Sequence, residues 1–316
     1  MFTYFKQNKL KERVNLFKEI LNSCVLCPRE CKINRLEGEI GFCGAGIKPK
    51  IFSYQVHFGE EPPISGERGS GTIFFSHCSN RCIYCQNWRF SQLGEGKEVS
   101  ISELAQIMLE LQEKGCQNIN LVTPTHYLPQ ILEALQRAIA EGLNLPLVYN
   151  TSGYERIEIL KLLEGIIDIY LPDMRYGDDE VAFKYSQMKN YVQVNQRAIK
   201  EMYRQVGNLV LENGVAERGL IIRHLVLPNN LAGTEKVIKF IKEEISSYCY
   251  LSLMSQYYPF YKAKEVPLIN RSITHKEYQR ACAIIFDLGL ENGWVQEGID
   301  EMTRLDFAGE YFNPFI

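Results

Sequence analysis

The sequence of 316 residues lacks the features that mark membrane, secreted and nucleic-acid-binding proteins. No run approaches the roughly 20 consecutive apolar residues that a membrane-spanning helix needs. The first residues lead straight into a charged segment and contain no apolar core of a secretory signal. The formal net charge is only −3, and no basic stripe with interleaved aromatic residues is present. We therefore expect a cytoplasmic protein with no membrane and no nucleic acid as a partner.

The chain is not short of cysteine, because it contains 10. In a reducing compartment this number indicates metal binding and not a disulfide framework. Seven of the cysteines lie in two tight groups before residue 86. Cys116, Cys249 and Cys282 stand alone in apolar surroundings, and we predict that they are buried packing residues.

The second cysteine group consists of Cys78, Cys82 and Cys85, with the spacing C-x3-C-x2-C and Tyr84 just before the last cysteine. Three thiolates can hold three corners of a cubic [4Fe–4S] cluster and leave the fourth iron free for a small molecule. A structural zinc ion would need a fourth ligand from elsewhere in the chain. A fully closed cluster would need one too, and His77 is the nearest candidate. The spacing favours the open cluster.

The first group consists of Cys24, Cys27, Cys31 and Cys43, whose four thiols can close around one metal ion or one cluster. Neighbouring glycines allow the tight turns that aim thiolates at a common point. Zinc and an auxiliary iron–sulfur cluster both suit four sulfur ligands. So small a region buries little core, and we expect the metal to hold its fold together. A zinc-ribbon nucleic-acid binder is disfavoured by the missing basic stripe.

The chain after residue 71 alternates between strand and helix patterns, and it follows an amphipathic helix predicted over residues 4–22. Strands are predicted at 71–76, 118–122, 145–149, 166–171, 220–227 and 249–254, with a short terminal strand near Val295. Helices are predicted at 102–114, 128–141, 155–164, 178–204 and 234–244, and a last one starts at Thr274 with a capping box to Glu277.

Six strand–helix units in sequence favour a parallel sheet with the helices outside. No Gly-x-Gly-x-x-Gly follows a strand, which disfavours a dinucleotide-binding fold. We predict an α/β fold, a partial (β/α)6 TIM-like barrel over residues 71–316, with a small cysteine-rich N-terminal extension over residues 1–70. The three-cysteine loop then lies at the carboxyl end of the first strand, where barrels place their chemistry.

Polar residues follow the other predicted strands, and the carboxyl ends of parallel strands converge at one mouth. Hydroxyls, amides, one acid and two arginines there suit a ligand with ribose, amine and carboxylate groups. The candidates are Thr123, Thr125, His126, Asn150, Ser152, Asp173, Arg175, Arg223 and Gln256. Asp173 and Arg175 also fit a structural ion pair, and His126 a hydrogen-bonded turn residue. For Glu60, Glu61 and Tyr54, solvent exposure is favoured over a place along a substrate path.

The three-cysteine motif resembles the signature of the radical S-adenosylmethionine (SAM) superfamily, in which SAM chelates the open iron. More narrowly, nearly the whole chain resembles the glycyl-radical-enzyme activating enzymes, such as pyruvate formate-lyase activating enzyme, and their relatives with a cysteine-rich N-terminal extension. The matching segments are Cys-x2-Cys-Pro-Arg-x-Cys at 24–31, and residues 57–66, 85–87, 149–154, 171–173 and 255–259.

The resemblance implies roles for the mouth residues. The backbone around Tyr84 would meet adenine, and Gln86, Asn87 and Gln256 would also bind the cofactor. The loop with Thr123, Thr125 and His126 stands where Gly-Gly-Glu binds the methionine amino group. Asn150 and Ser152 would lie near the ribose, Asp173 and Arg175 beside the sulfonium, and Arg223 near the carboxylate. The chain departs from the pattern in three places: Gln86 replaces a histidine, Arg175 replaces a lysine, and Gly-Gly-Glu is absent.

The hypothesis is a radical SAM enzyme with Cys78, Cys82, Cys85, Asp173 and Arg175 as its catalytic residues. Reductive cleavage of SAM would give a 5′-deoxyadenosyl radical, which takes a hydrogen atom from a substrate. The resemblance implies a glycyl radical enzyme as a possible protein substrate and a flavodoxin or ferredoxin-type reductant as a partner. The alternative is a non-catalytic iron–sulfur electron-transfer or metal-scaffold protein.

Overall fold

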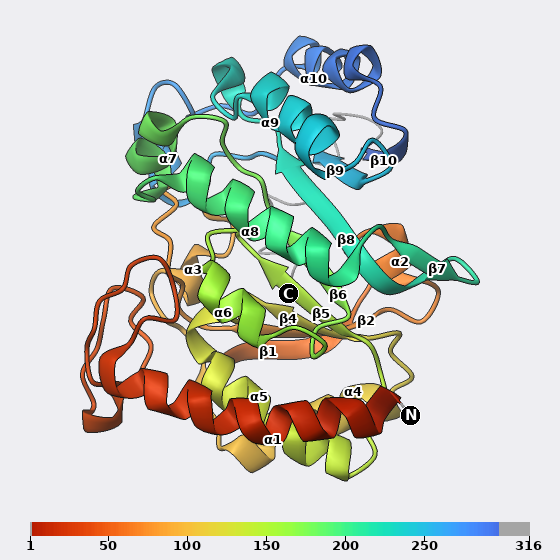
Figure 1. Ribbon diagram of the computed structural model, residues 1–316. Helices are drawn as coiled ribbons and strands as arrows, with labels where there is room; N and C mark the ends of the chain where they lie inside the picture. The colour runs from red at the N-terminus through yellow and green to blue at the C-terminus, as the bar shows by residue number, and fades with distance from the viewer. Residues whose placement is uncertain (1, 297–316) are drawn as a thin grey trace.

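A computed structural model describes residues 2–296, with side chains from residue 9 onward, and it contains one sheet of ten strands (Figure 1). The strand order is β10-β9-β8-β6-β5-β4-β2-β1-β3, and β7 pairs with β8 in a hairpin. The strands are β1 Lys50–His57, β2 Ser70–Phe75, β3 Lys97–Glu98, β4 Ile119–Val122, β5 Leu147–Thr151, β6 Ile169–Pro172, β7 Val210–Glu212, β8 Val215–Leu225, β9 Tyr250–Met254 and β10 Asn292–Val295.

Seven strands, from β2 to β10 without β3 and β7, run parallel and follow one another across the sheet in chain order. This order arises when each strand–helix unit is added on the same side of the previous one, as in a barrel. The predicted α/β fold is confirmed, and its mostly parallel sheet is consistent with a partial TIM-like barrel. β10 adds a seventh parallel strand and contains Val295 as expected.

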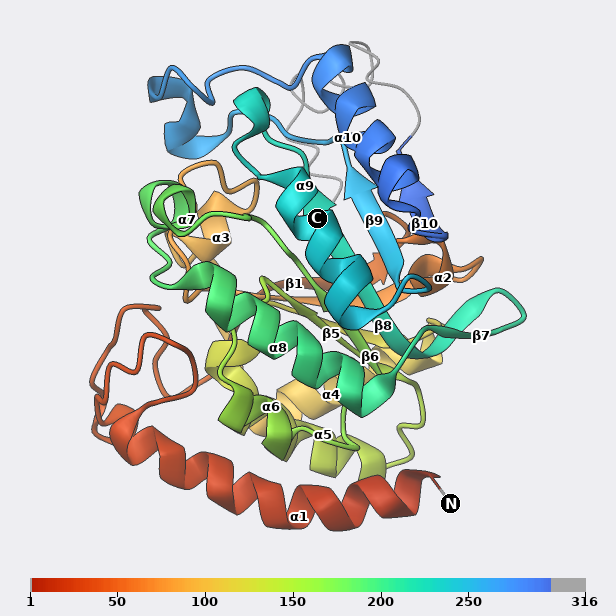
Figure 2. The same cartoon turned by 45° about the horizontal axis from the view of Figure 1, so that its top comes forward.

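Helices cover the outer face of the sheet, and α1 runs across α5 outside them (Figure 2). The contacts α4–α5, α6–α8 and α9–α10 join neighbouring helices of this layer. The helices are α1 Phe2–Ile20, α2 Pro62–Ser65, α3 Trp88–Ser91, α4 Ile101–Glu113, α5 Leu128–Ala140, α6 Ile157–Leu162, α7 Asp179–Ser186, α8 Tyr191–Val206, α9 Thr234–Phe240 and α10 His275–Leu288.

Helix boundaries follow local capping chemistry. The predicted capping box of Thr274 and Glu277 starts α10, and a second one, of Ser100 and Glu103, starts α4. The span 178–204 was predicted as a single helix, which is wrong, because α7 ends at a left-handed Gln187 before α8 begins.

The two faces of the sheet differ because side chains alternate along each strand. In β4, Ile119 and Leu121 join the large apolar core with the helices, so Asn120 points to the inner face. Inner-face residues of β5, β6 and β8 pack against Ile64 of α2. The short helix α2 therefore closes the inner face near the β7–β8 end (Figure 1).

β1 was not predicted, and it directly precedes α2 in the chain. It lies within residues 1–70, the range expected to form the extension, and pairs antiparallel with β2 over most of its length. The sheet thus begins before residue 71, and the cysteine-rich loops precede it. Within residues 2–296, no helix combines the length and apolar character needed to cross a bilayer.

Candidate active site

The three-cysteine loop starts directly after β2, at the carboxyl end of the parallel sheet. Backbone N–H groups of Arg81 and Ile83 donate to carbonyls at the end of α7, which fixes the path of the loop. Cys78 and Cys82 are buried, and Cys85 is half-buried. The Asn80 N–H donates to Cys78 Sγ at 3.4 Å. The Cys78 thiol is thus held by the backbone of its own loop, and Cys85 Sγ lies 3.1 Å from Ser91 Oγ.

The donor set fits a [4Fe–4S] cluster. Burial raises the pKa of Cys78 to about 12 and that of Cys85 to about 11, and the nearby Cys82 adds to both shifts. Within residues 2–296, no three His, Cys, Asp or Glu side chains converge as the ligands of a single metal ion would. A cubane binds each thiolate at a different iron, so three thiols on one short loop can hold three of its corners.

A cavity of about 140 Å³ opens beside Cys85 at the carboxyl ends of the strands. Aromatic and apolar side chains line it together with polar groups, as is usual for a ligand site. Eight of the residues predicted to bind the cofactor line this cavity: Tyr84, Gln86, Asn87, Asn150, Asp173, Arg175, Arg223 and Gln256. The structure therefore brings the cysteine loop and most of the predicted mouth residues together.

A buried charge network joins the cavity to the cysteine loop. Asp173 accepts hydrogen bonds from Arg175 Nη2 at 2.6 Å and from Arg223 Nε at 3.0 Å. Arg175 Nη1 lies 3.3 Å from Cys82 Sγ. Burial alone would raise the pKa of Asp173, but Arg223 and Arg175 outweigh it and lower that pKa. Asp173 is thus a carboxylate at neutral pH, and it fixes both guanidinium groups.

The register of the sheet explains why these residues meet. A parallel β-bridge between Asp173 and Arg223 keeps the register of β6 and β8, three residues beyond the Tyr170–Leu220 pair. The Thr123 N–H donates to the Asn150 carbonyl at 2.8 Å, which extends the pairing of β4 and β5 in the same way. Gln86 Nε2 donates to the Gln256 carbonyl at 2.9 Å, so the cysteine loop also contacts the far end of the sheet.

Glu60 is a cavity residue that the sequence analysis missed. Its side chain is 2% exposed, and its Oε1 accepts from Asn120 Nδ2 at 2.8 Å and from Asn150 Nδ2 at 3.3 Å. Its Oε2 lies 3.4 Å from Arg223 Nη1. Burial raises the pKa of Glu60, while Arg223 opposes that rise. The expectation of solvent exposure is wrong for Glu60 and also for Glu61, which is buried.

Four predicted cofactor residues do not line the cavity. Thr125 donates to Glu155 Oε1 at 2.6 Å on the helix side of the sheet, and His126 Nε2 lies 2.8 Å from the Ser76 carbonyl. Ser152 Oγ accepts from Asn80 Nδ2 at 2.6 Å, so it supports the cysteine loop from behind. Thr123 has a left-handed backbone, with φ of 56°. These four residues therefore lie next to the cavity and do not face a ligand in it.

Comparison with known families decides the assignment of this chain. Residues 72–241 match the model of the radical SAM superfamily. The chain belongs to the radical SAM superfamily. Membership implies a [4Fe–4S] cluster and SAM as cofactors, and the three thiols and the adjoining cavity are the groups that fit them.

Relatives of this radical SAM protein include two proteins of Methanocaldococcus jannaschii. The uncharacterized protein MJ0674 is 35% identical over 289 residues, covering 88% of this chain and 78% of its own. The uncharacterized protein MJ0808 is 24% identical over 264 residues, covering 77% and 73%.

Two solved structures are similar at low sequence identity. The structure described as native anSMEcpe with bound AdoMet has a TM-score of 0.46 at 14% identity, covering 74% of this chain and 65% of that chain. The structure of TYW1 with a lysine-pyruvate adduct bound has a TM-score of 0.43 at 13% identity, covering 70% and 73%.

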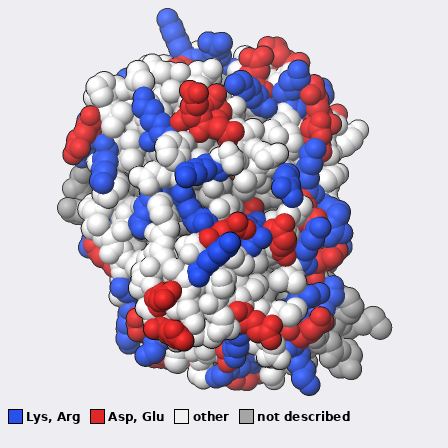
Figure 3. Space-filling view, turned by 60° about the vertical axis from the view of Figure 1, so that its left-hand side comes forward, with Lys and Arg blue, Asp and Glu red and all other residues white. Residues whose placement is uncertain are grey.

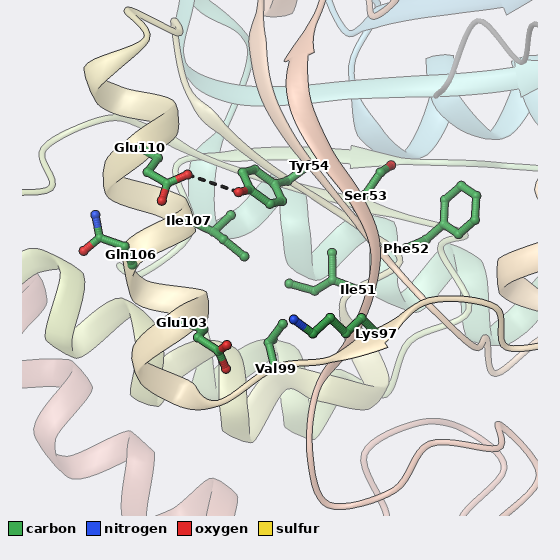
Figure 4. Close-up of a pocket in the computed structure, with 10 residues that line it drawn as sticks. All are labelled: Ile51, Phe52, Ser53, Tyr54, Lys97, Val99, Glu103, Gln106, Ile107 and Glu110. Atoms are coloured by element: carbon green, nitrogen blue, oxygen red, sulfur yellow. Dashed lines mark hydrogen bonds between the residues drawn. The ribbon is translucent and has the colours of Figure 1, made fainter.

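A second cavity of this radical SAM protein, of about 490 Å³, lies outside the sheet between β1 and α4 (Figure 4). Tyr54 lines it and donates a hydrogen bond to Glu110 Oε2 at 3.1 Å across its rim. None of its lining residues is a cysteine or belongs to the charge network. Although this cavity is larger, it shares no residue with the cysteine loop or the charge network, so we do not assign it to the active site.

The cysteine-rich extension, at the left of Figure 1, contacts the cysteine loop, because Arg29 Nε donates to the Ser79 carbonyl at 3.0 Å and Arg81 Nη2 donates to the Phe42 carbonyl at 2.6 Å. The buried Arg35 donates to the His126 carbonyl at 2.6 Å, and Arg156 donates to the Val25 carbonyl at 2.8 Å. The face on this side of the molecule carries positive and negative side chains interspersed (Figure 3). The extension is therefore bound to the barrel beside the carboxyl ends of the strands.

Proposed function

We propose that this protein cleaves SAM reductively, with the catalytic cluster on Cys78, Cys82 and Cys85 and with SAM in the adjoining cavity. When bound, the cluster supplies one electron to the sulfonium of SAM, which yields methionine and a 5′-deoxyadenosyl radical. The observation that carries the proposal is the position of Arg175, which contacts Cys82 Sγ and the cavity acid Asp173 at once. A ligand in the cavity would thus lie against the cysteine loop.

The charges of the cavity suit the amino-acid end of SAM. Asp173 already accepts hydrogen bonds from two arginines, so its negative charge is balanced. Glu60 is paired less closely, at 3.4 Å from Arg223, and is the carboxylate with more capacity for a ligand ammonium group. We infer that Glu60 binds the amino group of SAM in place of the missing Gly-Gly-Glu, and that Arg223 binds its carboxylate.

Formation of 5′-deoxyadenosine tests the main proposal. Anaerobically reconstituted protein with dithionite and SAM is expected to form it, and Cys82→Ala is expected to form none. Addition of SAM is expected to change the EPR spectrum of the reduced cluster, because SAM binds the open iron. An unchanged spectrum would support the alternative of a closed electron-transfer cluster, and equal product from both proteins would refute the proposal.

SAM affinity tests the role of Glu60. Loss of a hydrogen bond to a charged group costs about 1.5–3 kcal/mol, so Glu60→Gln should weaken SAM binding roughly 10- to 100-fold. Glu61→Gln is the matched control, since Glu61 is adjacent, is buried and also acts on the charge of Arg223, but does not line the cavity. Equal effects of both substitutions on the Kd for SAM would refute the assignment to Glu60.

We propose that the radical takes a hydrogen atom from a protein, and a glycyl radical enzyme is the candidate that the similar segments support. The chain departs from the activating-enzyme pattern at Gln86 and Arg175 and lacks Gly-Gly-Glu. Other substrates are therefore to be compared in the same assay. Incubation with a glycyl radical enzyme deuterated at glycine should transfer deuterium into 5′-deoxyadenosine and produce a glycyl radical signal. A flavodoxin or ferredoxin-type protein is the proposed reductant. Absence of transfer would refute this substrate while leaving SAM cleavage intact.

A further inference from the structure

One edge of the sheet is only partly covered. β3 pairs with β1 at Lys50 and Ile51 alone, whereas β2 pairs with the other side of β1 as far as His57. In the described part of the chain, no further strand follows β3 in the sheet. The N–H and C=O groups that residues 53–56 of β1 direct to this side therefore have no strand to pair with among residues 2–296. These four residues are here called the open edge of β1.

The chain before β3 turns away from β1 at Gly96, which leaves the edge open. Gly96 has a φ of 139°, and a Cβ at this position would lie 2.6 Å from the Ile51 carbonyl oxygen. Ser76 Oγ donates to the Glu95 carbonyl at 2.5 Å, so the residues before β3 run toward the end of β2 and not along β1. β3 thus covers the first residues of β1 and leaves the remainder uncovered.

The cavity of about 490 Å³ lies beside the open edge, between β1 and α4. Figure 4 shows Ile51, Val99 and Ile107 turned toward this space, and they are 5%, 8% and 7% exposed. Alternate side chains of a strand point to the same face of a sheet. A segment that paired with the open edge would therefore place every second side chain in the cavity, against an apolar floor.

Helix α4 supplies a charged rim to the cavity. Glu103, Gln106 and Glu110 follow one another at helical spacing, so they share the face of α4 that lines the cavity. Glu110 is half-buried and accepts a hydrogen bond from the Tyr54 hydroxyl at 3.1 Å. Among the described residues, Lys97 is the single basic residue that lines the cavity. Two carboxylates and one ammonium group suit a ligand that carries a basic side chain.

The open edge lacks the devices that usually keep a sheet from pairing with another chain. Such edges commonly contain a proline or an inward-pointing charge, or a bulge interrupts them. Residues 53–56 are Ser-Tyr-Gln-Val and include neither proline nor a charged residue. The bulge of β1 lies between Ile51 and Ser53, and pairing with β2 is regular from Ser53 to His57. Regular main-chain geometry next to an apolar cavity fits an extended peptide.

We propose that the open edge of β1 binds an extended segment of a partner protein, which adds a strand to the sheet next to β3. Main-chain hydrogen bonds hold the segment, and its alternate apolar side chains fill the cavity over Ile51 and Ile107. A basic side chain of the segment pairs with Glu110. The cavity shares no residue with the one beside Cys85, so this inference does not rest on the proposed function.

Selection of short random peptides displayed on phage tests the occupant. We expect the peptides that are enriched on the full-length protein to alternate apolar and polar residues and to contain lysine or arginine. This pattern follows from the apolar floor of the cavity and the carboxylates of α4. No enrichment, or enrichment of peptides without the alternation, would overturn the proposal.

The Kd of an enriched peptide tests the role of the cavity. Glu110→Lys is expected to weaken binding about tenfold, because it replaces attraction by repulsion at the basic side chain. Glu113→Lys is the matched control, since Glu113 is exposed on the same helix but does not line the cavity. That substitution should change the Kd less than about twofold. Equal effects of both substitutions would overturn the assignment to this cavity.

Methylation of the peptide amides tests the strand pairing itself. Alternate N–H groups of a paired strand point to its partner, so methylation of one alternate set should abolish binding and methylation of the other should preserve it. Hydrogen exchange of the outward-pointing amides of residues 53–56 should slow in the complex. Equal loss with both methylated sets would overturn the added strand. A dimer in sedimentation that the peptide dissociates would instead assign the open edge to a second copy of the chain and overturn the proposed partner.

Discussion

The catalytic loop and the extension both carry their cysteines outside helices and strands, but their surroundings differ. The loop offers three thiols, and its last one, Cys85, borders a cavity with charged walls. The extension offers four thiols, and Cys24, Cys27 and Cys43 are buried. An open side next to a polar cavity allows a ligand to reach the metal, whereas a fourth thiol takes up that position. The comparison teaches that the surroundings of a cysteine group, more than the spacing of its cysteines, distinguish a catalytic site from a structural one.

The arginines beside the two groups differ in the same way. Arg175 contacts Cys82 and is held by the carboxylate of Asp173. Arg29 contacts a carbonyl and an aromatic ring, and its Nη2 is buried with no hydrogen-bond partner in the described residues. Pairing with Asp173 fixes the orientation of Arg175 beside the cavity. The charge of Arg29 is not balanced by a paired carboxylate, so it can act on nearby sulfur atoms.

Replacing one cysteine of the catalytic loop, with a lone cysteine as the control, should have the largest effect. Cys82→Ala should lose the catalytic cluster and all SAM cleavage, because two thiolates remain for a site that needs three. Cys249→Ala should retain both, since Cys249 is a buried packing residue. Iron content and 5′-deoxyadenosine formation measure the difference. Wild-type activity in Cys82→Ala would contradict the assignment of the loop.

The buried Glu155 tests how burial between the cysteine-rich extension and the barrel affects stability. Burial raises its pKa from 4.5 to about 7, and its charge in turn raises the pKa of Cys27. An acid with a raised pKa in the folded state destabilises the fold as pH rises from 4.5 to about 7. At 1.36 kcal/mol per pH unit, this amounts to about 3 kcal/mol. Glu155→Gln should remove that loss.

The melting temperatures of the wild type and of Glu155→Gln at pH 5.5 and 7.5 check this sign. The variant should gain stability relative to the wild type at the higher pH, while other titrating groups act equally on both proteins. A difference that does not depend on pH would show that the Glu155 carboxyl titrates normally.

Arg175→Lys tests whether the arginine beside the catalytic loop orients a ligand in the cavity. Lysine keeps the charge but loses the fork that bridges Asp173 and Cys82. Changes at groups that orient a metal ligand cost roughly 10- to 100-fold in affinity or activity. We expect a fall of that size in kcat/KM for SAM cleavage, and no fall for Arg137→Lys. Equal values in both variants would place Arg175 outside the site.

A pair of glycines measures how closely the extension contacts the loop. Gly38 and Gly44 have almost the same φ, 85° and 86°, so alanine strains both backbones alike. A Cβ at Gly38 meets nothing within 4 Å, whereas one at Gly44 lies 2.8 Å from His77 Nδ1. We expect Gly44→Ala to cost about 1 kcal/mol more than Gly38→Ala in unfolding free energy. Equal costs, measured by denaturant unfolding, would show that His77 gives way freely.

The sequence predicted the parts of this structure that depend on local pattern. Buried runs such as β2 and the periodicity of α5 mark elements directly, and chain order then places Asp173 and Arg223 at one mouth. β1 was missed, because its alternation of buried and exposed side chains is interrupted by a bulge between Ile51 and Ser53.

Glu60 and Thr125 show why the rest of the site was not predictable. The surroundings of each residue depend on which face of the sheet its side chain contacts. The fold decides that face, and the neighbouring residues in the sequence do not. Two consecutive acids before two prolines look like a solvated turn, yet Glu60 is held by Asn120 and Asn150 from two strands. Thr125 follows a strand as expected, but it faces the helix layer and bonds to Glu155.

The segment from β1 through α2 brings Glu60 to the inner face before any parallel strand has appeared in the chain. A growing polypeptide leaves the ribosome from its N-terminus, so this carboxylate is synthesised ahead of Asp173 and Arg223, which later surround it. The Glu60 carboxylate therefore gains its partners Asn120, Asn150 and Arg223 only after β4, β5 and β8 have been synthesised.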